Sequence, residues 1–133
     1  MYDAVTATLD VLRLVAGDAE SDLDEQLQPL IDEFGWTAVC DGVFEALESK
    51  ETAIWRPAAA AVWGAALDKR EMDVHRAIAL VYFRLDPNKP GEEDNLNLTW
   101  SIASKLKGVG YLSSYDPRLD PPVKEQLEQL RAR

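Results

Sequence analysis

His75 is the only histidine in the sequence, and a histidine can serve as a general base or as a metal ligand near neutral pH. Glu71 precedes it by four residues, a spacing that places two side chains on the same face of a helix. A zinc site needs further ligands, and the single cysteine, Cys40, falls in an apolar stripe that is typical of a buried side chain. The sequence therefore predicts no metal site.

Acidic residues gather at positions 18–25, which raises calcium binding as a second chemistry. An EF-hand loop beginning at Asp18 would place Leu23 at the required glycine and Pro29 at the bidentate acid. A loop beginning at Asp86 would place Asn97 at the bidentate acid. Neither segment fits the calcium-binding pattern.

Ser113 and Ser114 lie close in sequence to Asp116, and a serine nucleophile would have to take His75 as its base. These residue types are common, so their spacing does not single out a catalytic triad. The sequence also lacks the GxSxG motif, the GxGxxG motif and a phosphate-binding loop. We therefore expect no catalytic residues, no enzyme activity and no cofactor.

The chain has 133 residues, of which 47% are hydrophobic, and this composition fits a single globular domain over residues 1–133. The longest apolar run free of charge, residues 57–67, is shorter than the roughly 20 residues that cross a bilayer. The N-terminus shows no basic segment followed by an apolar one, and a lone cysteine forms no internal disulfide. We expect a cytoplasmic protein that does not enter a membrane.

The charge is unevenly distributed along the chain, whose net value is −10. Residues 1–51 contain 13 acidic and 2 basic residues and carry −11, whereas the remainder contains 11 acidic and 12 basic residues and carries +1. An acidic field repels nucleic acid and anionic lipid and attracts a basic surface. We expect a basic protein as the partner and no direct binding of nucleic acid.

Two interpretations of the acidic segment remain open. Acidic side chains favour the N-termini of helices and keep a small protein soluble. They also speed association with a basic surface and disfavour wrong partners. On the second interpretation, the segment presents an acidic face for docking, made of Asp18, Glu20, Asp22, Asp24, Glu25, Asp32 and Glu33.

Apolar residues recur at helical spacing along most of the chain. In the first part they predict helices over residues 3–16, 23–34 and 36–47. Pro29 lies inside the second of these, and we expect it to kink or break the helix near Gln28 because proline lacks an N–H and clashes with the preceding turn.

A fourth helix should have Pro57 in its first turn and continue through a run of alanines to Leu67. Asp73 is the expected N-cap of a fifth helix, which must end before Pro87. Residues 86–94 contain two prolines, a glycine and several acids, and they predict a surface loop.

Asp94 or Asn95 should cap a sixth helix that ends at a structured connector over residues 108–122. The apolar side chains of the connector need a surface on which to pack. Asp120 as N-cap and Pro121 at the first helical position open the last helix.

No segment alternates polar and β-branched residues, so the sequence predicts an all-α fold of about seven short helices. Successive short helices suggest an irregular antiparallel array, either a HEAT-like stack of hairpins or an orthogonal bundle. The sequence shows no repeat of fixed period, and both arrangements remain open.

Aromatic residues fall into two groups, according to whether they lie on an apolar stripe. Those on stripes, which we expect in the core, are Trp36, Trp63 and Trp100. Those at helix starts or in the connector, which we expect to be more exposed, are Trp55, Tyr111 and Tyr115. If exposed, Tyr111 and Tyr115 would serve as apolar anchors for a partner, because aromatic residues supply much of the binding energy of interfaces.

In its size, acidity and helical content, the chain as a whole resembles the immunity proteins that neutralise bacterial toxins, including those of contact-dependent inhibition systems. The resemblance implies a tight complex with a cognate toxin domain, often a basic nuclease, and it assigns no role to any single residue. A helical adaptor that binds a peptide in a groove between helices is the alternative, as is a mimic of nucleic acid. An electrostatic docking module and a groove-binding adaptor differ in how strongly salt slows association.

Overall fold

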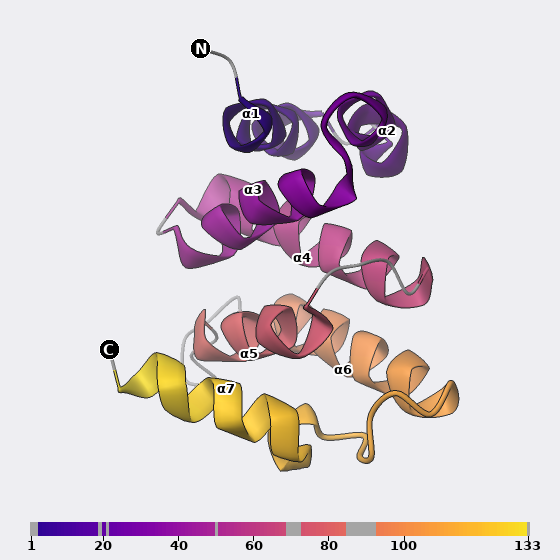
Figure 1. Ribbon diagram of the computed structural model, residues 1–133, viewed down its shortest axis with the longest axis vertical. Coiled ribbons are helices and arrows are strands. Elements are labelled where there is room, and N and C mark those ends of the chain that lie inside the picture. Colours follow the sequence, from indigo (N-terminus) through magenta and orange to yellow (C-terminus); the bar gives the residue numbers. More distant parts are fainter. Residues whose placement is uncertain are drawn as a thin grey trace. The chain divides into compact units, whose positions relative to one another are not determined.

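The computed structural model describes residues 3–18, 20, 22–49, 51–68, 73–84 and 93–132, and over these residues every element is helical (Figure 1). There are seven α-helices and one short 3-10 helix in this part of the chain, and there is no strand. The all-α fold predicted from the sequence is therefore confirmed. In order, the elements are α1 (Ala4–Gly17), α2 (Leu23–Phe34), α3 (Trp36–Glu48), α4 (Thr52–Asp68), α5 (Val74–Arg84), α6 (Glu93–Gly108), η1 (Pro117–Leu119) and α7 (Pro121–Arg131).

The chain divides into two compact units, Met1–Met72 and Asp73–Arg133. The first holds α1 to α4 and the second holds α5, α6, η1 and α7. That both units form one domain over residues 1–133 stays a prediction, as does the choice between a stack and a bundle for the whole chain. None of the helices in the described ranges combines the length and the hydrophobicity that a bilayer-spanning segment requires.

In the first unit, α1 packs against α2, α3 and α4, and α3 also packs against α4. Figure 1 shows α1 beside α2, with α3 and α4 forming the next layer of this unit. The Asp3 carboxylate opens α1 by accepting a hydrogen bond from the N–H of Thr6 at 2.8 Å, which satisfies one of the free donors of the first turn. The larger fully buried side chains of this unit are Leu12, Leu27, Val39, Val43, Leu47, Ile54 and Val62.

Helices α1 and α3 approach each other closely where Thr8 faces Gly42. Thr8 is completely buried, and its hydroxyl donates to the carbonyl of Ala4 at 2.7 Å, so the side chain is satisfied within its own helix. A Cβ atom at Gly42 would lie only 2.5 Å from the Cβ of Thr8. Gly42 therefore allows the two helices to come together at a distance that no other residue permits.

Helix α2 contributes little to the core, since Leu27 is its only buried residue. The side chain of Asp22 caps its first turn and Gly35, with φ of 86°, ends it. The predicted break near Gln28 is wrong, because α2 runs unbroken through Pro29. Pro29 is exposed, so its ring lies at the surface while Leu27 holds the same stretch of helix against the core.

Helix α4 begins earlier than its sequence predicts, so the placement of Pro57 in a first turn is wrong. The helix starts at Thr52, and Ile54 and Trp55 are buried with exposed fractions of 1% and 5%. Burial of these two large side chains stabilises an additional turn before the proline. The expected exposure of Trp55 is wrong for the same reason.

In the second unit, α7 and η1 pack against α5, and α6 also contacts α5. Asp73 caps α5 by accepting from the N–H of Arg76 at 3.0 Å, and Asp120 caps α7, which begins with Pro121. Both caps were predicted from the sequence and are confirmed. The buried apolar side chains of this unit include Ile78, Leu80, Val81, Ile102, Leu106, Leu112, Val123, Leu127 and Leu130.

The sixth helix starts slightly earlier than predicted. It begins at Glu93, which places Asp94 and Asn95 inside the helix instead of at its cap. Most of the surface loop predicted over residues 86–94 lies outside the described residues. The connector over residues 108–122 is ordered as predicted, and it contains the turn of 3-10 helix from Pro117 to Leu119.

The contact between Thr8 and Gly42 makes a prediction about helix packing. Gly42→Ala should lower the free energy of unfolding by about 1–3 kcal/mol, because its methyl group overlaps the buried threonine side chain. Gly64→Ala, in the middle of α4, is the matched control. A Cβ atom there meets only the Oδ1 atom of Asp24 at 3.5 Å, an ordinary contact, so this change should raise stability by up to about 1 kcal/mol. Urea unfolding of both variants measures the difference, and equal effects of the two alanines would contradict the packing argument.

Candidate functional site

The seven residues of the acidic face are all solvent-exposed. Three of them accept hydrogen bonds close to their own positions: Asp18 from the N–H of Glu20, Asp22 from two N–H groups of α2, and Asp32 from the side-chain amide of Gln28. Within the described ranges, none of the seven carboxylates forms an ion pair. Among the described residues, no cation therefore neutralises these carboxylates through an ion pair.

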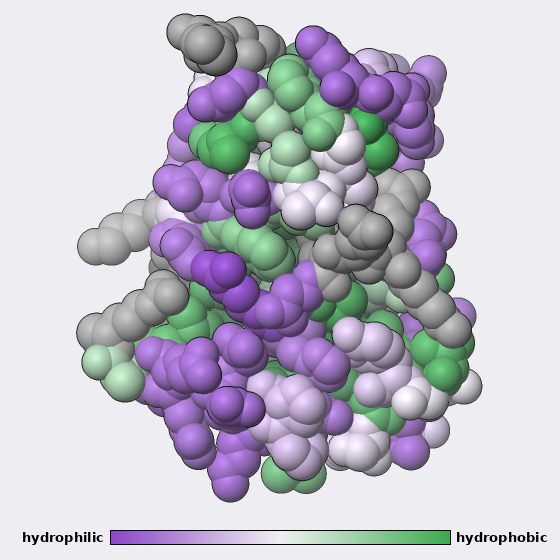
Figure 2. Space-filling model, viewed as in Figure 1, coloured by the Kyte–Doolittle hydropathy of each residue, from purple (hydrophilic) through white to green (hydrophobic). Residues whose placement is uncertain are grey.

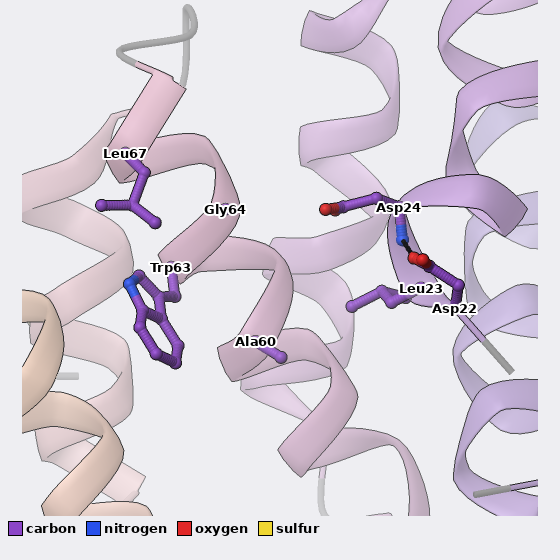
Figure 3. A pocket seen from close by; sticks show the side chains of 7 residues that line it. All are labelled: Asp22, Leu23, Asp24, Ala60, Trp63, Gly64 and Leu67. Carbon is purple, nitrogen blue, oxygen red and sulfur yellow. Dashed lines mark hydrogen bonds between the residues drawn. The ribbon is translucent and has the colours of Figure 1, made fainter. Parts of the chain in front are cut away.

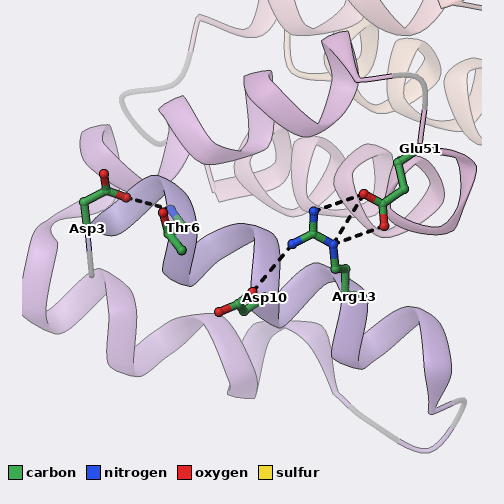
Figure 4. A network of polar contacts seen from close by, with 5 residues as sticks. All are labelled: Asp3, Thr6, Asp10, Arg13 and Glu51. Atoms are coloured by element: carbon green, nitrogen blue, oxygen red, sulfur yellow. Dashed lines mark hydrogen bonds and ion pairs between the residues drawn. The ribbon is translucent and has the colours of Figure 1, made fainter. Parts of the chain in front are cut away.

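Arg13, in contrast to these carboxylates, forms ion pairs, and its partners are acidic residues outside the acidic face (Figure 4). Its Nη2 atom lies 3.0 Å from Oε2 of Glu51, its Nε atom donates to Oε1 of the same residue at 3.1 Å, and its Nη1 atom lies 3.5 Å from Asp10. The hydrogen bonds from Arg13 hold the pKa of Glu51 below its usual value, and the same bonds raise the pKa of Arg13. This pair ties α1 to the start of α4 at the surface.

The space-filling view gives the same picture of the surface of the first unit. Residues in the region of α2 are coloured mostly as hydrophilic (Figure 2). This agrees with the single buried residue of that helix. The outward surface of α2 is thus polar and acidic, while its inward side holds Leu27 in the core.

A small pocket lies beside the acidic face, between the N-terminal turn of α2 and the second half of α4 (Figure 3). Its volume is about 290 Å³. The residues that line it are Asp22, Leu23, Asp24, Ala60, Trp63, Gly64 and Leu67. Two of them carry a negative charge and five are apolar or small, so the pocket has an acidic edge and an apolar wall.

The position of each pocket residue follows from local structure. Oδ1 of Asp22 accepts from the N–H of Asp24 at 3.0 Å and from that of Glu25 at 3.3 Å, which fixes the first turn of α2. Asp24 then points its carboxylate across the gap to α4 at Gly64, as Figure 3 shows. Leu67, on the same helix, has 51% of its surface exposed, a high fraction for a leucine. An exposed apolar wall beside two carboxylates suits a ligand with an aliphatic stem and a cationic head.

Sequence reasoning identified Asp22 and Asp24 but missed the α4 wall of the pocket. The only sign in the sequence was Gly64, a glycine within an alanine-rich helix, where glycine is unfavourable by roughly 0.5–1 kcal/mol relative to alanine. The sequence alone does not show which helix faces that glycine.

Tyr111 and Tyr115, the predicted anchors, are exposed as expected, at 43% and 54%. They belong to the second unit, whereas the acidic face belongs to the first. Tyr111 stacks on His75 with ring centroids 4.9 Å apart, and the Nζ atom of Lys107 lies 4.9 Å above the ring of Tyr115. Burial, with a smaller effect of nearby acids, raises the pKa of Tyr111.

Other aromatic and apolar expectations need correction. Trp100 is 44% exposed instead of buried, because it lies on the outer side of α6. Trp36 and Trp63 are partly buried. In the connector, Leu112 is buried but Leu119 is 69% exposed, so only part of the connector finds a surface on which to pack.

His75 and Ser113 meet the same carboxylate, that of Asp120, which is itself buried. Ser113 donates from its hydroxyl at 3.1 Å and from its N–H at 3.2 Å to Oδ2, and Nε2 of His75 lies 3.8 Å from Oδ1. A nucleophilic triad would place the histidine between the serine and the acid. Here the carboxylate of Asp120 lies between His75 and Ser113. It therefore joins α5, the connector and α7, and we call these contacts the clamp around Asp120.

The remaining candidates from the sequence are Ser114 and Asp116 for catalysis and Glu71 and Cys40 for metal binding. Asp116 pairs with Arg118, with 2.8 Å between Oδ2 and Nη2, and its N–H donates to the hydroxyl of Ser114. Hydrogen bonds from Arg118 lower the pKa of Asp116. Glu71 lies outside the described residues, and Cys40 is buried as predicted. Among the residues that the structure describes, no group of three or more histidine, cysteine or acidic side chains is arranged to hold a metal ion.

Comparison of the chain with protein-family models, with curated proteins and with solved structures finds no match.

The clamp around Asp120 predicts a structural role that a measurement of stability can test. Asp120→Ala removes the acceptor for Ser113 and for the N–H of Val123, and it should lower the free energy of unfolding by about 1–3 kcal/mol. Asp120→Asn keeps one acceptor oxygen and should cost less. Chemical unfolding of the two variants gives the comparison, and an Asp120→Ala protein as stable as the unmodified chain would rule out the clamp.

Tyr82 makes a prediction about alkaline pH. The Cζ atom of Arg118 lies 5.6 Å from its ring centroid, its buried hydroxyl has no hydrogen-bond partner among the described residues, and burial raises its pKa to about 12. A tyrosine in the unfolded chain ionises near pH 10. Ionisation of Tyr82 should therefore favour unfolding as the pH rises from about 10 to about 12, while leaving stability below pH 10 unaffected.

Tyr82→Phe should keep or raise stability at neutral pH, since it removes an unsatisfied hydroxyl, and it should make the loss of stability above about pH 10 less steep. Urea unfolding at neutral pH and at about pH 11 measures both effects. An unchanged alkaline slope in the variant would contradict the assignment.

Proposed function

We propose that this chain is a protein-binding module that docks a basic partner through the acidic face of its first unit. The single observation that supports the proposal is that seven exposed carboxylates on this face have no ion-pair partner among the described residues. Each exposed ion pair inside the protein would cancel part of the field, and here that cancellation is missing. The uncancelled field is available to steer a basic surface toward the face.

The kind of partner follows from the sign and the concentration of this charge. A protein that acts on nucleic acid carries a basic substrate channel, because it must neutralise phosphates. An acidic module that covers such a channel blocks access of the substrate. We therefore propose that the chain is an immunity protein that neutralises a toxin such as a nuclease, in line with the resemblance in size, acidity and helicity. We also propose that it acts in the cytoplasm, because a reducing compartment suits a chain whose single cysteine has no second cysteine with which to form an internal disulfide.

A peptide-binding adaptor is the second candidate, and one observation favours it. The connector of the second unit exposes four large apolar side chains: Val109, Tyr111, Tyr115 and Leu119. Exposed large apolar residues concentrated in one segment favour a binding surface. Association through this connector would depend little on salt, because burial of apolar surface supplies the free energy.

The test begins with affinity capture from the native host at low and high salt, followed by identification of the captured proteins. The association rate of the purified partner is then measured against ionic strength. The proposal predicts a basic, stoichiometric partner whose association slows steeply as salt rises. A partner whose association rate is independent of salt would contradict the proposal and favour the adaptor.

The triple variant Asp22→Asn, Asp24→Asn, Glu25→Gln tests the acidic face itself. Asparagine caps a helix as well as aspartate does, and exposed charges contribute little to stability, so the free energy of unfolding should change by less than about 1 kcal/mol. Association with the captured partner at low salt should slow on the order of 10-fold or more. The matched control neutralises three exposed acids outside the acidic face, Asp41→Asn on α3 and Glu125→Gln and Glu128→Gln on α7. If the triple variant unfolds, or if it binds as fast as the control, the acidic face is not the docking surface.

A further inference from the structure

The pocket between α2 and α4 extends the proposed function to a specific contact. We propose that this pocket receives the side chain of one arginine or lysine of the basic partner, which serves as the anchor of the interface. The inference rests on the proposed function, because it takes the partner to be basic. It is carried by the size of the pocket, by the chemistry of the residues that line it and by the presence of Gly64.

The size of the pocket fits a side chain. Its volume of about 290 Å³ lies just below the range of roughly 300–1,000 Å³ that is usual for sites of drug-sized ligands and cofactors. A long amino-acid side chain is smaller than those ligands. The pocket is also open to solvent along the acidic face, since Asp22, Asp24 and Leu67 are all exposed.

The chemistry of the walls fits a cation on an aliphatic stem. The carboxylates of Asp22 and Asp24 provide acceptors for an ammonium or guanidinium group, and charge-assisted hydrogen bonds are the stronger kind. Leu23 and Ala60 provide apolar surface for the methylene groups behind that head. A neutral apolar side chain would leave the carboxylates without a partner, and an anionic one would be repelled by them.

The positive end of the α2 dipole lies at this same place and opposes a cation. That end amounts to about half an elementary charge. Oδ1 of Asp22 already accepts from the N–H groups of Asp24 and Glu25, so these two donors of the first turn are satisfied. The full charges of Asp22 and Asp24 exceed the remaining dipole, and the pocket is electronegative on balance.

Gly64 is the independent observation in favour of a ligand. Glycine inside a helix is less favourable than alanine, and Gly42 is explained by the threonine that faces it. Among the described residues, no side chain crowds Gly64 in this way, because a Cβ atom there would meet only Oδ1 of Asp24 at 3.5 Å, an ordinary contact. A side chain at this position would, however, narrow the pocket. The glycine keeps space open that the packing of the described residues does not require.

The test is a titration of the isotopically labelled full chain, followed by nuclear magnetic resonance, with the N-acetyl amides of arginine and of lysine as probes. The N-acetyl amide of norleucine, which has the stem without the charge, is the control ligand. We expect saturable shifts of the backbone amides of Asp24, Ala60 and Gly64 with at least one cationic probe. Comparison of the two cationic probes shows which residue type the pocket prefers.

Variants of the chain decide whether the pocket itself binds. Asp24→Asn should weaken binding at least about 5-fold, the loss expected for one charge-assisted hydrogen bond, and Gly64→Leu should abolish the saturable shifts by filling the space. Asp41→Asn, an exposed acid on α3 outside the pocket and outside the acidic face, is the matched control and should bind as the unmodified chain does. Thermal unfolding of each variant verifies that it is folded.

Three outcomes would overturn the inference. They are the lack of saturable shifts in the pocket amides, equal binding of the norleucine probe, and an equal loss in Asp41→Asn and Asp24→Asn. The last result would mean diffuse attraction to an acidic surface, which leaves the proposed docking face standing while removing the pocket. If the pocket binds a cationic probe saturably but capture of the partner does not depend on salt, the docking face is rejected and the pocket is retained.

Discussion

The close approach of α1 and α3 at Thr8 and Gly42 is the constraint on which the first unit depends. It brings two helices together at a distance that only a glycine permits, and the threonine is satisfied by a bond within its own helix. Because α1, α3 and α4 supply nearly all of the buried side chains, α2 needs to bury only Leu27. The side of α2 that faces solvent carries four acids of the acidic face, Asp24, Glu25, Asp32 and Glu33, together with one edge of the pocket.

The acids on this surface combine local and long-range roles. Asp22 satisfies the first turn of α2, so part of the acidic segment has a structural reason, as the solubility and capping interpretation holds. Among the described residues, the seven carboxylates have no ion-pair partner, whereas Arg13 pairs with Asp10 and Glu51. The proposed docking would use this unpaired charge, since a face that is neutralised internally has no field to offer a partner. The pocket beside Asp24 adds a place where diffuse attraction can become a specific contact.

Local chemistry was predictable from the sequence, and long-range packing was not. Asp73 and Asp120 could be recognised as residues that open helices, and the all-α class followed from apolar periodicity. The effects of Pro29 and Pro57 were mistaken because packing by Leu27, and by Ile54 and Trp55, stabilises helix around each proline. The pocket could not be predicted, because the pairing of Asp24 with Gly64 depends on how α2 and α4 meet. The clamp around Asp120 could not be predicted for the same reason, because His75 lies on α5, far from Asp120 in the sequence.

Hydrogen exchange of the chain, free and in complex with its captured partner, is the most direct measurement of where that partner sits. The account predicts that binding slows exchange in residues 23–34 of α2 and in residues 60–67 of α4, with little change in the connector over residues 108–120. Slower exchange confined to the connector, with α2 unchanged, would contradict the acidic docking face and place the partner on the second unit.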